Sequence, residues 1–371
     1  MKKLAVLGTA IALSNLTYGA DAATQAQIDE LKAQIAALAD SVDAQAEGPA
    51  NPVYIGGYGE MHLNLNQGTD NEIDYHRFVL FFGKEFTDKV RFFSELELEH
   101  SLAGDGKPGE VELEQAYVEV DVTENTQVKT GLFLLPVGIL NETHEPETFY
   151  GVERNNVEKR IIPTTWWEGG VMVSGNIADG LSYDVAMHSG LNNDEAVIRS
   201  GRQKVAEATA NKAAYTARLK YTAVPGLELA VSGQYQDDIL QGAGDDEIGA
   251  ALLEAHAIYQ TGGFGIRALY AQWNIDSDVE TEAAENFGAG KQNGYYIEPS
   301  YRINEQVGVF YRNSMWDTAA GDSNDSEKTQ NDIGVNYWLA DTAVLKADYF
   351  RQETAGELSA TGYNLGVGFS F

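Results

Sequence analysis

The chain contains no cysteine and little positive charge. Its 371 residues include 25 Lys and Arg against 56 Asp and Glu, which gives a net charge of −31. Without cysteine no disulfide can form, so backbone hydrogen bonds and burial must stabilise the fold. The scarcity of basic residues argues against a nucleic-acid partner, because an acidic surface repels phosphates. No run of about eighteen apolar residues occurs, which excludes a membrane protein built from transmembrane helices.

The sequence also lacks the common enzyme signatures. Its six histidines are scattered, no His-x-x-x-His pair or cysteine cluster suggests a zinc site, and no Gly-x-Ser-x-Gly nucleophile motif occurs. Glu95 and Glu97 can mimic a glycosidase pair, but alternate positions on one strand are weak evidence without a cleft. We therefore expect no catalytic residue, no metal ion and no cofactor.

Residues 1–22 have the pattern of a secretory signal peptide. Lys2 and Lys3 precede an apolar run over residues 4–13, and Ala20-Asp21-Ala22 has the small-x-small pattern of a cleavage site. The apolar run is too short to span a bilayer. We therefore predict that the chain is exported and that its mature form begins at residue 23.

Residues 23–46 are rich in Ala, Gln, Asp and Glu and contain neither Gly nor Pro. Their apolar residues recur at alternating intervals of three and four, which predicts a short coiled-coil helix that joins protomers. A single amphipathic helix lying on its own protein is the alternative. The seam residues are Ile28, Leu31, Ile35, Leu38 and Val42. Residues 47–52, Glu-Gly-Pro-Ala-Asn-Pro, form a linker.

From residue 53 onward, apolar and polar residues alternate with a period of two, which is typical of β-strands. The last strand shows the pattern most clearly, because Tyr363, Leu365 and Val367 share one face while Gly366 and Gly368 share the other. We interpret the second face of each strand as one that lines water. The predicted strands are 53–65, 75–86, 89–100, 110–122, 125–136, 166–178, 180–189, 212–223, 226–236, 248–260, 263–275, 294–304, 306–316, 329–339, 342–352 and 361–371.

The connections between these strands alternate in length. Tight turns are marked by residues such as Asp179 and Gly262, whereas long polar segments such as 191–211 and 276–293 lie between them. Short turns at one end and long loops at the other are typical of outer-membrane barrels. A soluble sandwich is the alternative, but the strands are longer than the roughly five or six residues usual in soluble sheets. We predict an all-β protein: a sixteen-stranded antiparallel transmembrane β-barrel over residues 53–371, preceded by the short coiled-coil helix.

The segment 137–165 is long and differs from the other connections, since it mixes acidic and basic residues. A loop of this length needs a reason, and in a wide barrel the reason is to fold inward and narrow the lumen. An external loop with solvated charges is the alternative. The predicted constriction residues are Glu142, His144, Glu145, Glu147, Arg154, Glu158, Lys159 and Arg160.

Charged residues on the strands form a second candidate site. Glu95, Glu97 and Glu99 alternate with leucines and should all line water, together with Glu112 and Glu114. Acidic and basic walls that face each other would orient solutes, whereas salt bridges that only shape the lumen are the alternative. The predicted inward-facing basic residues are Arg91, Lys129, Arg218, Lys220, Arg267, Arg302, Arg312 and Lys346.

The part from residue 53 to residue 371 resembles a Gram-negative trimeric porin, and more narrowly the phosphate-selective porin O and P group. The resemblance rests on Glu114-Gln-Ala-Tyr-Val118, on Gly131-x-Phe-x-x-Pro-x-Gly138, on the long third loop and on the aromatic terminal strand. It implies an outer-membrane homotrimer surrounded by lipid and passive diffusion of small hydrophilic solutes. It also implies assembly by the barrel-assembly machinery, which would read Phe369 and Phe371 at the end of the chain.

The charges of the long loop suggest a preference among ions. Anion-selective members of the family line the pore with arginines and carry lysines on the inward loop, whereas this loop carries five glutamates against Arg154, Lys159 and Arg160. A cation preference is therefore expected, since negative charge raises the local concentration of cations. An anion-selective or phosphate-selective porin is the first alternative. A non-conducting structural protein tethered by its helix, and an outer-membrane hydrolase, are the alternatives from other classes.

Overall fold

The computed structural model describes residues 52–193, 198–243, 247–276, 290–321 and 325–371. By its contacts the chain divides into two units, residues 1–52 and Val53–Phe371, and the second unit is the one described here. The predicted signal peptide, the coiled-coil helix with its seam residues and nearly all of the linker lie outside the described residues.

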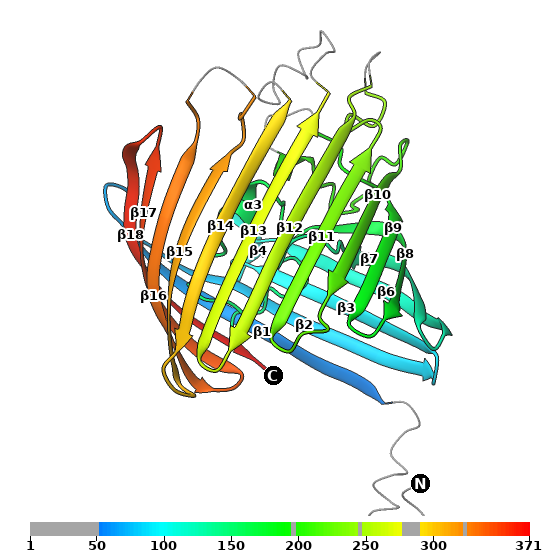
Figure 1. The fold of residues 1–371 in the computed structure, drawn as a ribbon, viewed down its shortest axis with the longest axis horizontal. Helices are drawn as coiled ribbons and strands as arrows, with labels where there is room; N and C mark the ends of the chain where they lie inside the picture. Colours follow the sequence, from blue (N-terminus) through cyan, green and yellow to red (C-terminus); the bar gives the residue numbers. More distant parts are fainter. Residues whose placement is uncertain (1–51, 194–197, 244–246, 277–289, 322–324) are drawn as a thin grey trace, which may run out of the picture. The chain divides into compact units, whose positions relative to one another are not determined.

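Sixteen antiparallel strands close into one barrel, which confirms the predicted barrel (Figure 1). A separate two-stranded hairpin, β4 (Ala103–Gly104) and β5 (Lys107–Pro108), extends from the loop after the third strand. The barrel strands are β1 (Val53–Asn66), β2 (Glu72–Thr87), β3 (Val90–Glu99), β6 (Val111–Thr123), β7 (Thr126–Leu134), β8 (Trp167–Ala178), β9 (Leu181–His188), β10 (Ala214–Tyr221), β11 (Leu227–Gln236), β12 (Ala250–Thr261), β13 (Phe264–Ile275), β14 (Lys291–Arg302), β15 (Val307–Asp317), β16 (Lys328–Ala340), β17 (Ala343–Thr354) and β18 (Glu357–Ser370).

The alternation of residue types explains why these segments form a barrel. On β12, Leu253 is 57% exposed on the outer face whereas the next residue, Glu254, is fully buried on the inner face. The outer face carries many exposed apolar side chains, among them Val231, Tyr235 and Ile297, as a lipid-facing surface requires. Closure of the sheet leaves no strand edge, so every strand has a hydrogen-bonding partner on both sides. Among the described residues, no helix is long and apolar enough to cross a membrane.

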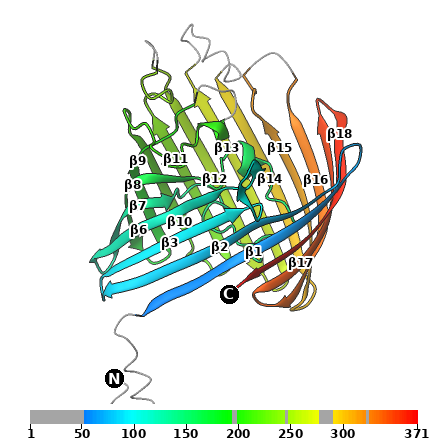
Figure 2. The same ribbon diagram turned by 180° about the vertical axis from the view of Figure 1, so that it is seen from behind.

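The first and last strands close the barrel at the end where the connections are short. β1 pairs with β18, and the backbone groups of Gly57 and Phe371 exchange two hydrogen bonds of 3.0 and 2.9 Å. The chain end therefore lies at the short-turn end of the barrel (Figure 2). The opposite end, which carries the longer loops, is called the long-loop end below.

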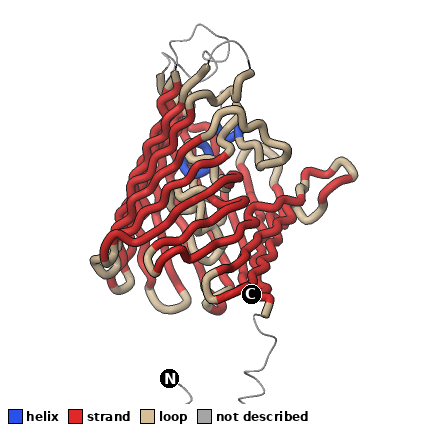
Figure 3. The backbone as a smooth tube through the Cα atoms, turned by 90° about the vertical axis from the view of Figure 1, so that its right-hand side faces the viewer, coloured by secondary structure: helices blue, strands red, loops and turns tan. Residues whose placement is uncertain are grey.

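Residues 135–166, between β7 and β8, fold into the barrel and are called the inner loop (Figure 3). Contacts with strands far apart around the ring hold this loop inside. The Trp273 indole on β13 donates to the carbonyl of Ile161 at 2.8 Å, and the amide of Asn336 on β16 donates to the carbonyl of Phe149 at 3.1 Å. Asp348 on β17 accepts a hydrogen bond from the backbone N–H of Val152 at 2.7 Å.

The inner loop contributes to an apolar core inside the barrel, which the alternation pattern did not predict. Its buried side chains pack against the inner faces of β8, β9 and β12 to β15, where Met172, Leu252 and Trp273 are buried. The loop residues of this core are Leu135, Val137, Ile139, Leu140, Phe149, Val157, Ile161, Ile162 and Trp166. The prediction that the inner faces line water was wrong over this part of the wall, because the loop fills it.

The inward glycines of the last strand also contact the loop. A Cβ atom added at Gly368 would lie 2.3 Å from the Cβ of Pro146, and one at Gly366 would lie 3.1 Å from Val152. These glycines therefore make room for the inner loop rather than simply facing water.

Three short elements were also absent from the prediction: the β4–β5 hairpin, helix α3 (Val157–Arg160) and the 3-10 turn Ile198–Gly201. Each is too short to give a periodic signal.

Candidate functional site: a charged constriction

Three cavities follow the inner side of β1, β2, β3 and β6, opposite the apolar core. An upper cavity of about 550 Å³ opens near the long-loop end, a middle cavity holds about 130 Å³, and a lower cavity of about 420 Å³ lies nearer the short turns. His62, His76, Glu153, Arg154 and Lys159 line both the upper and the middle cavity, so the two cavities are adjacent. The middle cavity is the smallest and is the candidate site.

Carboxylates from the strands form one wall of the middle cavity. Glu60 comes from β1, Glu99 from β3, and Glu112 and Glu114 from β6. They share a face because each occupies an inward position of its strand. Glu60 is bound by Arg77 of β2 at 2.7 Å, so this guanidinium neutralises part of the acidic wall.

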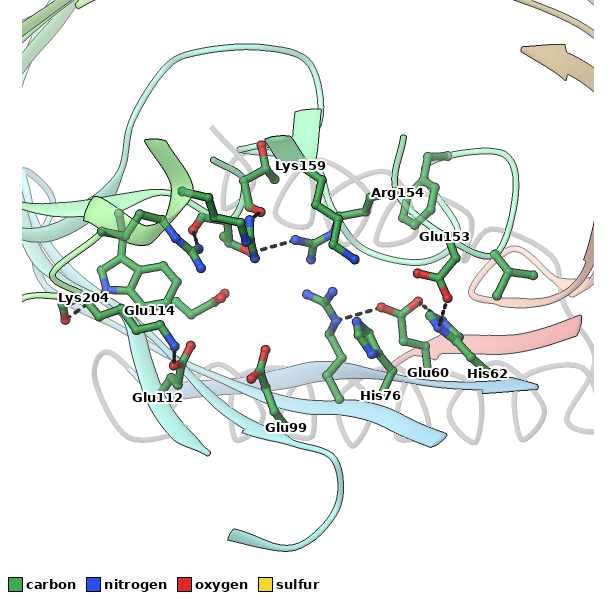
Figure 4. A pocket seen from close by; sticks show the side chains of 18 residues that line it. Glu60, His62, His76, Glu99, Glu112, Glu114, Glu153, Arg154, Lys159 and Lys204 are labelled. Atoms are coloured by element: carbon green, nitrogen blue, oxygen red, sulfur yellow. Dashed lines mark hydrogen bonds and ion pairs between the residues drawn. The ribbon is translucent and has the colours of Figure 1, made fainter. Parts of the chain in front are cut away.

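The opposite side of the middle cavity is basic. Arg154 and Lys159 come from the inner loop, and Arg199 and Arg202 come from the loop between β9 and β10. These four residues are called the cation shelf. In Figure 4, Arg154 and Lys159 lie across the cavity from Glu99, Glu112 and Glu60.

Oxygen atoms of Thr164 and Thr165, not carboxylates, hold the arginines of the shelf. Arg199 donates to the carbonyl of Thr164, Arg202 donates to the carbonyl of Thr165, and Arg154 donates to the Thr165 hydroxyl at 2.8 Å. No ion pair joins a shelf residue to a carboxylate within 4.0 Å in the part of the chain that the structure describes. Nitrogen atoms of Arg154 and Arg202 are buried without any hydrogen-bond partner there. The shelf therefore presents positive charge that the protein leaves available.

The shelf residues perturb one another because like charges crowd together. Burial, followed by the neighbouring Arg77, lowers the pKa of Arg154. Burial and the positive charges of Arg202 and Arg154 lower the pKa of Arg199 to about 9. Burial also lowers the pKa of Lys159. Because positive charges in this crowded position repel one another, an anion that entered would relieve their mutual repulsion.

A buried ionic cluster separates the middle and lower cavities. The Nε2 atom of His144 on the inner loop lies 3.5 Å from Glu95 and 3.6 Å from Glu114, and all three side chains are buried. Burial alone would lower the pKa of His144, but the Glu114 and Glu95 carboxylates outweigh it and raise this pKa to about 10. At neutral pH the imidazolium therefore ties the inner loop to β3 and β6.

The acidic residues of the inner loop occupy places other than the middle cavity, with one exception. Glu142 pairs with Arg218, Glu147 accepts a hydrogen bond from Ser370, Glu145 lines the lower cavity, and Glu158 is buried. The exception is Glu153, which accepts a hydrogen bond from His62 at 3.1 Å.

The basic residues of the inner loop face the cavities. Arg154 and Lys159 line the middle cavity, whereas Arg160 lines only the upper cavity. Together with the placement of the glutamates, this reverses the arrangement that the sequence suggested. At the narrow point the loop side is mainly basic and the strand side is mainly acidic.

Glu95 and Glu97 were expected to line water but are only 1% and 2% exposed. Glu95 lies beside His144 of the inner loop and borders the lower cavity. Glu97 lies 3.7 Å from the Nε of Arg77. Of Glu95, Glu97 and Glu99, only Glu99 lines the middle cavity. The alternation predicted that these carboxylates share one face of the strand, but it did not predict that Glu95 and Glu97 are buried.

None of the eight predicted wall cations lines the middle cavity. Four of them form ion pairs, as the salt-bridge alternative expected, and Lys129 is one of these because its Nζ lies 4.0 Å from Glu119. Arg91 pairs with Glu119 and Asp121, Arg218 with Asp184 and Glu142, and Arg312 with Glu298 and Asp332. Lys129 lies over the Tyr117 ring, Arg302 over Trp338 and Lys346 over Phe149, while Arg267 donates to the carbonyl of Thr148. Lys220 lies on β10 two residues beyond Arg218, toward the short-turn end.

The sequence patterns did not point to Arg77, His62, Arg199, Arg202 and Lys204 as residues of the site. Lys204 pairs with Glu110 at 2.7 Å and with Glu112. One signal was present, because Arg199, Arg202 and Lys204 form a basic cluster within six residues of a strongly acidic chain. The loop that carries them was expected to be an ordinary polar connection, so their inward position was not foreseen.

Phe369 and Phe371 end the chain beside β1. Their ring centroids lie 6.5 Å apart, and Phe371 is 57% exposed.

A protein of Aquifex aeolicus (strain VF5) is 31% identical to this chain over 337 residues, which cover 81% of this chain and 76% of the relative. The two chains belong to one family. The relative is described as an uncharacterised protein, so the family by itself assigns no activity. No family model matches the chain.

Several solved structures with this fold are outer-membrane proteins, among them a porin and a channel. The anion-selective porin from Comamonas acidovorans has a TM-score of 0.62 at 13% identity, with 87% of this chain and 100% of that chain covered. The trimer form of the outer-membrane protein OmpT of Vibrio cholerae has a TM-score of 0.59 at 13% identity, covering 87% and 100%. The outer-membrane channel DcaP of Acinetobacter baumannii has a TM-score of 0.59 at 12% identity, covering 87% and 98%. The closed sixteen-stranded barrel is thus the fold of outer-membrane proteins from Gram-negative bacteria.

Proposed function

We propose that the protein is an outer-membrane porin, a water-filled channel for passive diffusion of small hydrophilic solutes and ions. The observation that carries this proposal is the middle cavity, where the cation shelf faces the carboxylates of β1, β3 and β6 inside a closed barrel. Opposed rows of charge at the narrowest point of a lumen set a transverse field that selects and orients polar solutes. The inner loop and the charged lumen together determine which solutes pass.

The exposed apolar outer face fits surrounding outer-membrane lipid. A homotrimer is the proposed assembly, in line with the trimer form of one outer-membrane protein that shares the fold. We also propose that the terminal strand, with Phe369 and Phe371, is the part read by the barrel-assembly machinery. The N-terminal residues 23–46 would add a coiled-coil contact between protomers.

The test is to insert purified protein into a planar lipid bilayer and record conductance under a KCl gradient. Discrete steps are expected, and heat-sensitive electrophoretic mobility provides the control that the protein is folded. Folded, inserted protein that gives no steps would refute the channel and favour the non-conducting structural protein.

An anion-selective channel is the second candidate, and the unpaired shelf favours it. Because Arg154 and Arg202 contact no carboxylate within the described residues, their charge can act on solutes. The substitutions Arg154→Gln and Arg202→Gln should each shift the reversal potential toward cations. Arg351→Gln is the matched control, since Arg351 is exposed and pairs with Glu353. An equal shift in all three variants would show that net charge, not the shelf, sets selectivity.

Membership in the phosphate-selective porin O and P group is a further part of this second candidate. It is supported by a shelf of four basic residues, since phosphate oxygens bind arginine well. Phosphate should then reduce chloride current through the wild-type channel more than through Arg202→Gln. Equal inhibition of the two proteins would contradict phosphate recognition by the shelf.

A further inference from the structure

Three histidines gather at the upper cavity, which Arg154 and Lys159 of the cation shelf also line. His62 on β1 and His76 on β2 stack with ring centroids 4.7 Å apart, and His76 meets His100 edge to face at 5.8 Å. His100 follows the end of β3 directly. Half of the six histidines of the chain therefore lie together at one place in the lumen.

Asp74 joins two of these rings. Its Oδ2 atom lies 3.3 Å from Nδ1 of His76 and 2.8 Å from Nδ1 of His100. The three ligand atoms all lie within 4.8 Å of one another. Neighbouring ligands of a tetrahedral zinc ion with bonds of about 2.0–2.1 Å are roughly 3–3.5 Å apart, so only small movements would let an ion enter.

The backbone builds this arrangement. Between Glu60–Arg77 and His62–Asp74 the register of β1 and β2 shifts, so that Tyr75 and His76 together lie opposite one residue. This bulge lets His76 face the lumen next to Arg77, although adjacent strand residues normally face opposite sides. His100 has a left-handed backbone (φ 52°), and its N–H donates to the carbonyl of His76 at 3.1 Å.

His62 supports the site without contributing a ligand. Its two ring nitrogens are already bonded to Glu60 and Glu153, each at 3.1 Å. Its ring therefore holds the plane of His76 by stacking. Asp74, His76 and His100 have side chains 15%, 27% and 30% exposed, so an ion in the upper cavity can reach them and water can complete its coordination.

Two imidazoles and one carboxylate form a ligand set suited to Zn²⁺, Co²⁺, Ni²⁺ or Cu²⁺. Ca²⁺ and Mg²⁺ prefer sets made entirely of oxygen atoms. Among the described residues, the other groups of this kind contain at most one histidine. The group with His144 is buried and already forms an ionic cluster, and Glu112 of the remaining groups is bound by Lys204.

We propose that Asp74, His76 and His100 form a binding site for a borderline divalent transition-metal ion at the long-loop mouth of the lumen. The bound ion would place positive charge beside the upper cavity and tie β2 to the start of the loop after β3. This proposal does not depend on conduction, because binding is measured on the folded protein in detergent.

The experiment is calorimetric titration of the full chain with Zn²⁺, together with the visible spectrum of bound Co²⁺. Wild-type protein should bind one ion per chain. Asp74→Asn and His100→Gln should each weaken binding by about tenfold or more, since even residues behind metal ligands change affinity by about 10–100-fold. His256→Gln is the control, because its two ring nitrogens face two different carboxylates and the three groups do not converge.

The site would be supported if His256→Gln retains binding while both site variants lose it. A Co²⁺ spectrum typical of nitrogen ligation would also support it. Wild-type protein that binds no Zn²⁺ would overturn it, and so would site variants that bind as wild type does. Ca²⁺ that displaces Zn²⁺ at equal concentration would also overturn it, because imidazole ligands would then play no part. Heat-sensitive electrophoretic mobility verifies that each variant is folded. Two site variants are used so that the test still works if one of them does not fold.

Discussion

Glu158 offers the sharpest test of how the inner loop is held. This fully buried residue of α3 accepts hydrogen bonds at Oε2 from the backbone N–H groups of Ile139 and Leu140, at 2.8 and 2.6 Å. Its Oε1 accepts one from the hydroxyl of Tyr296 on β14 at 2.7 Å. One carboxylate thus joins the two halves of the loop and links them to the wall. Burial raises the pKa of Glu158, although these hydrogen bonds oppose the shift.

Substitution of Glu158 by alanine leaves two buried backbone donors without a partner. Each costs about 1–3 kcal/mol, so the folded position of the loop should lose about 2–6 kcal/mol. Glutamine should have a far smaller effect, because its oxygen can replace Oε2 while the Tyr296 hydroxyl rotates to accept from its amide. The difference between the two variants isolates the hydrogen bonds from the volume of the side chain.

The assay is limited trypsin digestion of folded protein, read at Arg154, Lys159 and Arg160 of the inner loop. When a loop opens and closes rapidly, its rate of cleavage is proportional to the population of the open state. A loss of about 5.5 kcal/mol raises that population relative to the closed state by about 10⁴-fold. Glu158→Ala should therefore be cut at least about 30-fold faster than wild type, and Glu158→Gln within about fivefold. Glu145→Gln is the control, since its side chain makes no hydrogen bond in the described structure. Equal cleavage of the alanine variant and wild type would refute the reasoning.

Two further predictions concern the same loop. Gly368→Ala should displace the inner loop, because the new Cβ would lie 2.3 Å from Pro146 and such overpacking costs about 1–3 kcal/mol. Gly83→Ala is the control and should leave digestion unchanged, because its new Cβ would lie no closer than 3.5 Å to any atom beyond the adjacent residues. His144 should hold the loop most firmly below pH 6.5, and less firmly as the pH rises toward the raised pKa of its ring, about 10. The reason is that a group with a raised pKa stabilises the folded state only while it is charged. Digestion at pH 6, 8 and 10 should show this trend in wild type and not in His144→Gln, and a flat profile in wild type would contradict it.

The sequence was sufficient for the barrel because the alternation of residues is a local property. Leu253 and Glu254 differ in polarity, and that difference alone places one in lipid and the other inside. The same period predicted all sixteen strands, and the alternating lengths of the connections predicted the two ends of the barrel. The bulge in β2 was not predicted, because Tyr75 and His76 look like any alternating pair until β1 fixes the register.

The charged site depended on tertiary structure. The composition of the inner loop suggested an acidic filter, yet Glu142 is bound by Arg218 and Glu158 by backbone groups, so the loop's basic residues line the narrow part. Arg199 and Arg202 join them from a separate loop. Alternation determines which face a strand residue occupies, but a loop has no such period, and the direction of its side chains follows from the contacts that bury its apolar residues. The sequence by itself therefore determined the barrel, and only the packing of the inner loop decided which charges meet inside it.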